Sequence, residues 1–61
     1  MNGTVKFFNN SKGFGFINGE DGKDYFVHTS GLESEIADAD SVEFEIMTDE
    51  KGPKAINVRK V

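Results

Sequence analysis

The sequence has 61 residues, enough for one small domain, and its seven basic and eleven acidic side chains give a net charge of −4. It contains no cysteine and a single histidine, which excludes disulfide bonds, thiolate metal sites and a histidine metal cluster. No apolar run approaches ~18 residues and no basic-then-apolar signal peptide begins the chain, so we expect a cytoplasmic protein without a membrane segment, a metal or a cofactor.

The first predicted strand covers residues 4–8, with Val5 facing the core. The adjacent Phe7 and Phe8 break the strict alternation of a strand. A bend or bulge here would expose both rings in part, and strand parity does not assign their faces. Residues 9–11, Asn-Asn-Ser, are typical of a turn because these side chains bond their own backbone.

Residues 13–18 form the second predicted strand, which places Phe14 and Phe16 on one face, ~6.6 Å apart. Gly13 and Gly15 fall on the other face. Glycine inside a strand marks a bend or a close approach of another backbone, which favours a binding surface. Lys12 adds a positive charge just before this strand. The alternative is that both phenylalanines belong to the core, as most phenylalanines do.

A turn at residues 19–23, with an Asp-Gly pair, predicts a hairpin to a third strand at residues 24–28. Antiparallel pairing sets Phe26 and His28 of this strand beside Phe14 and Phe16. The opposite face is predicted to be buried: Ile17, Tyr25 and Val27. The sheet would therefore have one aliphatic and one aromatic face, which favours exposure of the aromatic rings.

Residues 29–41 form the longest connection. Ser30 and Glu33 match a capping box, which predicts one short helical turn, and Leu32 and Ile36 are expected to close the bottom of the core. Residues 42–46 alternate strictly, so this strand should turn three apolar side chains inward and two glutamates outward. The inward residues are Val42, Phe44 and Ile46, and the outward residues are Glu43 and Glu45.

After a turn at residues 48–53, the fifth predicted strand covers residues 54–60, with Ile56 and Val58 in the core. Pro53 suits the start of this strand because it cannot donate to a sheet ladder. Five short strands joined by tight turns predict an all-β fold, a small antiparallel barrel.

The charges are segregated along the chain. Residues 1–19 hold Lys6 and Lys12 and no acid, all eleven acids fall within residues 20–50, and residues 51–61 hold four basic side chains. Salt limits the reach of each patch to roughly 8–10 Å, so the negative total does not exclude nucleic acid as a partner. Ordinary solvated faces would give the same pattern.

Residues 12–17 (KGFGFI) and 25–28 (YFVH) resemble the first and second ribonucleoprotein motifs of the cold-shock domain family. Residues 6–9 and 52–55 are similar to its first strand and its last turn, so the likeness spans residues 1–61 as a single cold-shock domain. The resemblance implies a five-stranded antiparallel Greek-key barrel of the OB type that binds single-stranded RNA and single-stranded DNA on its aromatic face. A barrel this small is expected to be a monomer.

The resemblance also implies roles for particular residues. It implies stacking by Phe7, Phe8, Phe14, Phe16, Phe26 and His28. It implies backbone or base-edge contacts from Lys6, Lys12, Asp24, Lys51 and Pro53. Three departures from the family pattern predict a shorter site and a lower affinity: Phe7 replaces the usual tryptophan, Thr29 replaces an aromatic residue, and residues 31–41 contain no aromatic residue.

Together these features predict an RNA chaperone that needs no ATP, has low sequence selectivity and acts in transcription or translation regulation and the cold response. An alternative is an adaptor that binds a protein through the same apolar face. The sequence argues against an enzyme, because it shows no nucleophile–base pair and no phosphate-cradling loop.

Overall fold

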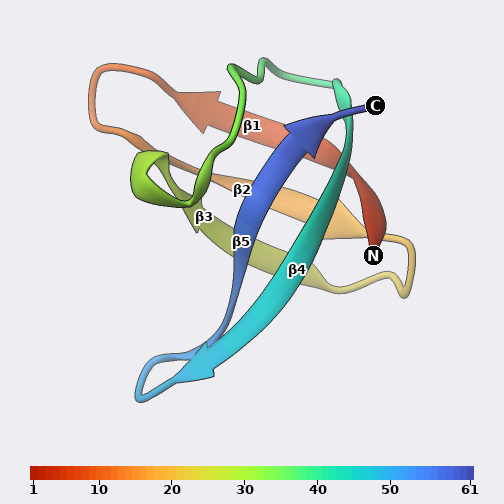
Figure 1. The fold of residues 1–61 in the computed structure, drawn as a ribbon, viewed down its shortest axis with the longest axis vertical. Coiled ribbons are helices and arrows are strands. Elements are labelled where there is room, and N and C mark those ends of the chain that lie inside the picture. Colours follow the sequence, from red (N-terminus) through yellow and green to blue (C-terminus); the bar gives the residue numbers. More distant parts are fainter.

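A computed structural model describes all residues, 1–61, and contains five strands and one 3-10 turn (Figure 1). The turn, η1, spans Thr29–Gly31. The strands are β1 (Asn2–Asn9), β2 (Phe14–Gly19), β3 (Asp24–His28), β4 (Ser41–Asp49) and β5 (Gly52–Lys60). None of its helical segments has the length and apolarity needed to span a membrane.

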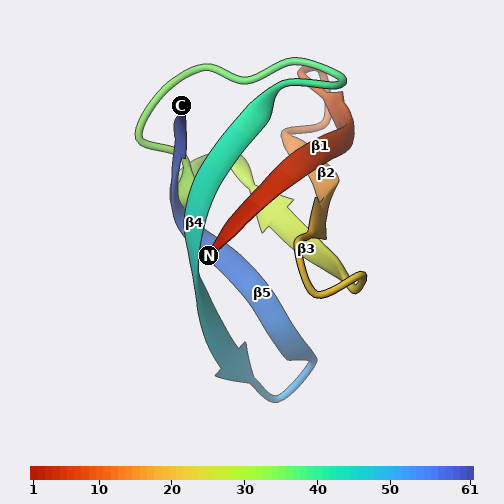
Figure 2. The same cartoon turned by 90° about the vertical axis from the view of Figure 1, so that its right-hand side faces the viewer.

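The strands form a closed barrel in the order β1-β2-β3-β5-β4, which confirms the predicted all-β, five-stranded fold of OB type. All neighbouring strands pair antiparallel except β3 and β5, which pair parallel at Phe26–Lys54 and Val27–Ala55. Figures 1 and 2 show that the β4–β5 hairpin extends beyond the ends of β1, β2 and β3. This hairpin therefore forms an arm beside the three-stranded part of the barrel.

The predicted strand β3 has the expected bounds, whereas β4 and β5 are longer than expected. Residues 48, 49, 52 and 53, which were expected in a turn, belong to the ladder, and only Glu50 and Lys51 connect the two strands. Gly52 allows this tight connection because its φ is +110°, a conformation that favours glycine. The Asp49 Oδ1 atom accepts a hydrogen bond from the Lys51 N–H at 2.9 Å and stabilises the turn.

Ten buried side chains form the core, and most of them were predicted: Val5, Phe8, Ile17, Tyr25, Val27, Ile36, Val42, Phe44, Ala55 and Val58. The prediction is wrong for Ile56, which is only partly buried, because a bulge in β5 changes which residues point inward. Glu43 pairs with Arg59 but Glu45 pairs with Ile56, so β5 holds one extra residue there. Asn57 adopts φ +51° within the bulge, and Ala55 takes the inward position.

The prediction is also wrong for Ile46, which is 40% exposed. Ile46 lies opposite Ala55 and so points to the inner side of the sheet. It belongs, however, to the part of β4 that pairs only with β5, in the arm beyond the barrel (Figure 1). An inward direction gives little burial where no other strand covers the sheet.

The predicted capping box is wrong, because the helical turn begins at Thr29 and His28 caps it. Leu32 is partly buried against the core and Ile36 is buried, in line with the prediction. The rest of this connection lies along the free edge of β1. The Val5 N–H donates to the Asp40 carbonyl at 2.8 Å, and the Phe8 N–H donates to Asp38 Oδ1 at 2.9 Å.

Candidate nucleic-acid interface

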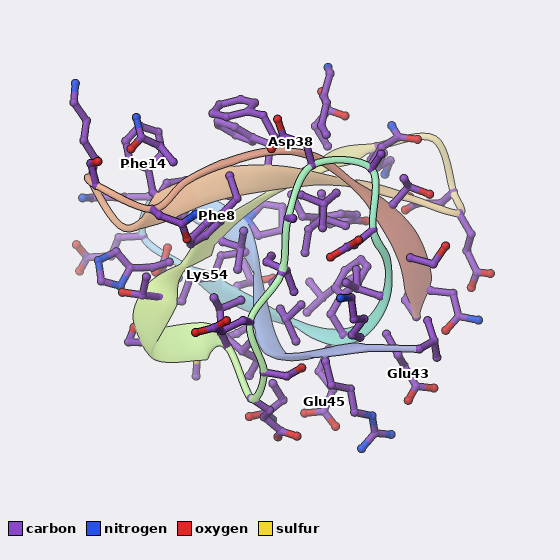
Figure 3. All side chains as sticks on the ribbon, turned by 90° about the horizontal axis from the view of Figure 1, so that it is seen from above. Phe8, Phe14, Asp38, Glu43, Glu45 and Lys54 are labelled. Atoms are coloured by element: carbon purple, nitrogen blue, oxygen red, sulfur yellow. The ribbon has the colours of Figure 1, made fainter.

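A bulge in β1 decides which of the two adjacent phenylalanines reaches the surface. Val5 pairs with Ile17 and Phe7 pairs with Phe16, so Lys6 is an extra residue in β1. Phe7 is 40% exposed, whereas Phe8 is 9% exposed and belongs to the core. The expectation that both rings are partly exposed is therefore wrong for Phe8, which the bulge turns inward beneath β1 (Figure 3).

Gly15 allows Phe8 to occupy this inward position. The two residues are paired across β1 and β2. A Cβ atom at Gly15 would lie 2.3 Å from the Phe7 carbonyl oxygen and 2.7 Å from the Phe8 ring, closer than real Cβ atoms come to their neighbours. The close approach of backbones predicted from the glycine is thus confirmed, and it also holds Phe7 beside Phe16.

Four phenylalanine rings from three strands form one continuous surface, which we call the aromatic platform: Phe7, Phe14, Phe16 and Phe26. The Phe7 ring lies 5.6 Å from Phe16, and the Phe16 ring lies 5.8 Å from Phe26. Phe14 and Phe26 are stacked at 6.1 Å with 21° between their planes. Figure 3 shows Phe14 projecting away from the barrel interior. The predicted pairing that sets Phe26 and His28 beside Phe14 and Phe16 is confirmed.

Three hydrogen-bonded side chains border the aromatic platform: Lys6, Asn18 and Asp24. Asp24 lies on the outer face of β3, where its carboxylate accepts hydrogen bonds from Lys6 Nζ at 2.9 Å and from Asn18 Nδ2 at 3.0 Å. These bonds, first that of Lys6 and then that of Asn18, lower the pKa of Asp24 below its ordinary value. The border thus offers an acceptor carboxylate and a lysine donor to polar groups of a ligand.

The turn between β1 and β2 carries Lys12, two residues before Phe14. Its backbone N–H donates to Asn9 Oδ1 at 3.0 Å, which orders the turn. No carboxylate lies within ion-pair distance of the Lys12 ammonium group or of Lys51. Both cations are therefore free to bind phosphates.

An open groove of about 830 Å³ continues from Phe26 toward the β4–β5 turn. His28 lines one side, and Lys51 and Pro53 line the other. The His28 Nδ1 atom lies 3.2 Å from the Ser30 backbone nitrogen and 3.0 Å from the Ser30 hydroxyl oxygen, which fixes the ring at the edge of the groove. The groove therefore brings His28 of β3 together with Lys51 and Pro53 of the β4–β5 hairpin, although these residues are far apart in the sequence.

The opposite side of the barrel is acidic and internally paired. Glu43 forms an ion pair with Arg59, which lowers the pKa of Glu43, and Glu45 accepts a hydrogen bond from Asn57. Figure 3 shows Glu43 and Glu45 on the side away from Phe14. Lys60 likewise lies 3.5 Å from Asp40. The basic residues of segment 51–61 therefore fall into two groups. Arg59 and Lys60 form ion pairs with acidic side chains away from the platform, whereas Lys51 and Lys54 line the groove.

The structure also places near the platform a cation that was not predicted as a binding residue. Lys54 pairs with Phe26 across β3 and β5, and it lines the groove. The parallel register that brings it there joins strands far apart in the sequence, so no local pattern indicates it. Of the predicted binding residues, only Phe8 lies in the core.

Comparisons with known proteins place the chain in a family. The family model described as the 'Cold-shock' DNA-binding domain matches residues 1–61. The chain is 56% identical over 63 residues to the cold shock-like protein CspE of Buchnera aphidicola subsp. Acyrthosiphon pisum, a match that covers 95% of this chain and 91% of that protein. It is 51% identical to the cold shock-like protein CspLB of Listeria monocytogenes, with 97% and 96% covered. It is 48% identical to the cold shock-like protein CspC of Escherichia coli, with 100% and 96% covered.

Proposed function

The chain belongs to the cold-shock DNA-binding domain family, whose members bind nucleic acids and are not enzymes, and from this premise we propose that it binds single-stranded RNA and DNA on the aromatic platform. The observation that carries the proposal is the set of four rings on one outer face, each of which contacts two of the others. Exposed aromatic rings stack unpaired bases, and each stacked base contributes ~1–3 kcal/mol.

The cations around the platform complement this stacking. Lys12 and Lys51 have no acidic partner and stand at two ends of the surface, in the β1–β2 turn and beside the groove. Phosphates between stacked bases would bind them, so affinity should fall with added salt. Because every base has an aromatic face, this arrangement has low sequence selectivity.

The binding roles differ among the predicted residues. Phe7, Phe14, Phe16, Phe26 and His28 would offer ring faces, whereas Phe8 would support the platform from the core. Polar contacts would come from the border and the groove: Lys6, Lys12, Asp24, Lys51 and Pro53. Thr29 packs against Gly13 and supplies no ring, and residues 31–41 supply none, so the site is short.

Binding of unpaired stretches makes the protein an RNA chaperone that uses no ATP, in this proposal acting as a monomer. A protein that binds the open form of a hairpin and not the closed form shifts the equilibrium toward the open form by mass action. At a free concentration a hundred times the Kd, the shift is about 2.7 kcal/mol. Such a shift would open weak RNA structures that form in the cold and so affect transcription and translation.

We expect the protein to open a weak RNA hairpin that carries a fluorophore and a quencher at its ends. Fluorescence should rise with protein concentration without ATP, and a hairpin with a much more stable stem should stay dark at the same concentrations. The concentration for half opening should scale with the Kd for an isolated strand of the stem, because the stem is unpaired only in the open form. A protein that binds the single strand tightly but leaves the weak hairpin closed would contradict the chaperone activity.

A further inference from the structure

A row of outward-facing residues crosses four strands, β1, β2, β3 and β5, and it continues beyond the aromatic platform. Phe7 pairs with Phe16, Phe16 with Phe26, and Phe26 with Lys54 on β5. The neighbouring pair in this register, Val27 and Ala55, is buried, so Phe26 and Lys54 both face outward. Lys54 is thus the next side chain along the row after the last ring.

The Lys54 ammonium group is held by an acidic neighbour. Its Nζ atom lies 3.4 Å from Asp49 Oδ2, and both side chains remain partly exposed. The other oxygen of this carboxylate, Oδ1, accepts the Lys51 N–H at 2.9 Å, which fixes the position of Asp49. Both residues line the groove that starts at Phe26.

The carboxylate keeps its charge at neutral pH. The Lys51 N–H lowers the pKa of Asp49 most, and Lys54 lowers it further. Lys54 is therefore the one basic side chain of the groove whose charge is already matched by a carboxylate, since Lys51 has no acidic partner within ion-pair distance.

We propose that Lys54 is a further phosphate-binding residue of this interface and that Asp49 competes with the nucleic-acid phosphate for its ammonium group. The inference rests on the proposed function, because it extends the same binding surface onto β5. A strand that stacks on Phe26 and enters the groove passes Lys54. Its phosphate can replace Asp49 because an exposed ion pair is weak and solvent-screened.

Replacing Asp49 by asparagine removes the competing charge and retains a side-chain oxygen for the Lys51 N–H. We expect Asp49→Asn to bind a short oligothymidylate about two- to fivefold more tightly at low salt, the range expected for release of an exposed ion pair. The slope of log K against log salt should become steeper by about 0.7, the value for one additional phosphate contact on a single strand.

Three matched variants separate this competition from a general loss of negative charge. Glu50→Gln changes the net charge equally and lines the same groove, but Glu50 has no lysine partner. Asp40→Asn releases Lys60, which lies outside the platform and the groove. Both should change affinity less than Asp49→Asn does. The excess gain from Asp49→Asn should disappear when Lys54 is replaced by glutamine.

The outcomes distinguish this inference from the proposed function. A gain for Asp49→Asn equal to that for Glu50→Gln, or a gain that persists with Lys54→Gln, would overturn the competition while leaving single-strand binding intact. Absence of binding by the unmodified protein at low salt would overturn the proposed function itself. Circular dichroism of each variant checks that the barrel is folded.

Discussion

Replacing Phe14 and Phe26 together by alanine should weaken binding of a short single strand on the order of a hundredfold or more, while the barrel stays folded. Each stacked base contributes ~1–3 kcal/mol, and every 1.4 kcal/mol is about tenfold in affinity. The two rings stack on one another at 6.1 Å, so their removal deletes two of the four rings of the aromatic platform. Neither ring belongs to the buried core. Fluorescence anisotropy with a labelled strand measures the affinity, and circular dichroism measures the fold.

A matched substitution shows whether the ring faces themselves are responsible. Phe26→Trp keeps an aromatic face at the same position and should bind at least as tightly as the unmodified protein. Unchanged binding by a folded Phe14→Ala, Phe26→Ala protein would show that the platform is not the binding surface.

Replacing Phe44 by alanine should have the opposite effect: it should destabilise the fold and leave the side chains of the aromatic platform unchanged. Phe44 is 1% exposed, and its ring packs 5.5 Å from that of Tyr25. Deleting a buried phenylalanine side chain costs about 3–5 kcal/mol. At roughly 0.05–0.15 kcal/mol per residue, a domain of this length has a free energy of unfolding of about 3–9 kcal/mol, so the substitution should remove at least about a third of it and all of it at the lower end of the range. Thermal and urea unfolding followed by circular dichroism measure the loss.

Ligand should restore part of this loss, because the platform residues of Phe44→Ala are intact. A single strand at a hundred times its Kd adds about 2.7 kcal/mol to the folded state. Phe44→Leu, which keeps most of the apolar volume, should lose much less stability. A Phe44→Ala protein as stable as the unmodified protein would contradict the assignment of Phe44 to the core.

The contrast between Phe14 and Phe44 shows which parts of this fold were predictable. In both strands the alternation is regular at these positions, so the neighbours of each phenylalanine reveal its face. Glycines flank Phe14 on a strand whose other side carries Ile17, and glutamates flank Phe44. The alternation of side chains along each strand assigned both residues to the correct face, and it also predicted that Phe16 and Phe26 lie side by side.

Parity failed wherever a bulge inserts one residue into a strand. Because of the bulge at Lys6, Phe7 lies on the surface and Phe8 in the core. Because of the bulge at Asn57, Ala55 and not Ile56 lies in the core. The broken alternation at Phe7 and Phe8 indicated the first bulge but not which ring faces inward. At the second bulge only the residue type of Asn57 hinted at an irregularity, since asparagine tolerates positive φ better than most residues. The position of a bulge depends on the partner strand, which a single strand's sequence does not contain.

The charged residues were the least predictable part of the site. The sequence separates basic and acidic segments, but the ion pairs join them across strands, as in Arg59 with Glu43 and Lys6 with Asp24. Which cations remain free for phosphate depends on these pairs. The free cations Lys12 and Lys51, and the paired Lys54, are therefore distinguished by the structure and not by the charge pattern.

The most direct test of single-strand binding by the aromatic platform is a titration of the unmodified protein with a short pyrimidine-rich strand at several salt concentrations, beside a hairpin of equal length. We expect tight binding to the strand that weakens with salt, with a slope of about −0.7 for each phosphate contacted, and weak binding to the hairpin. No binding to the strand at low salt would contradict the account. In that case the exposed aromatic rings would instead indicate a protein partner.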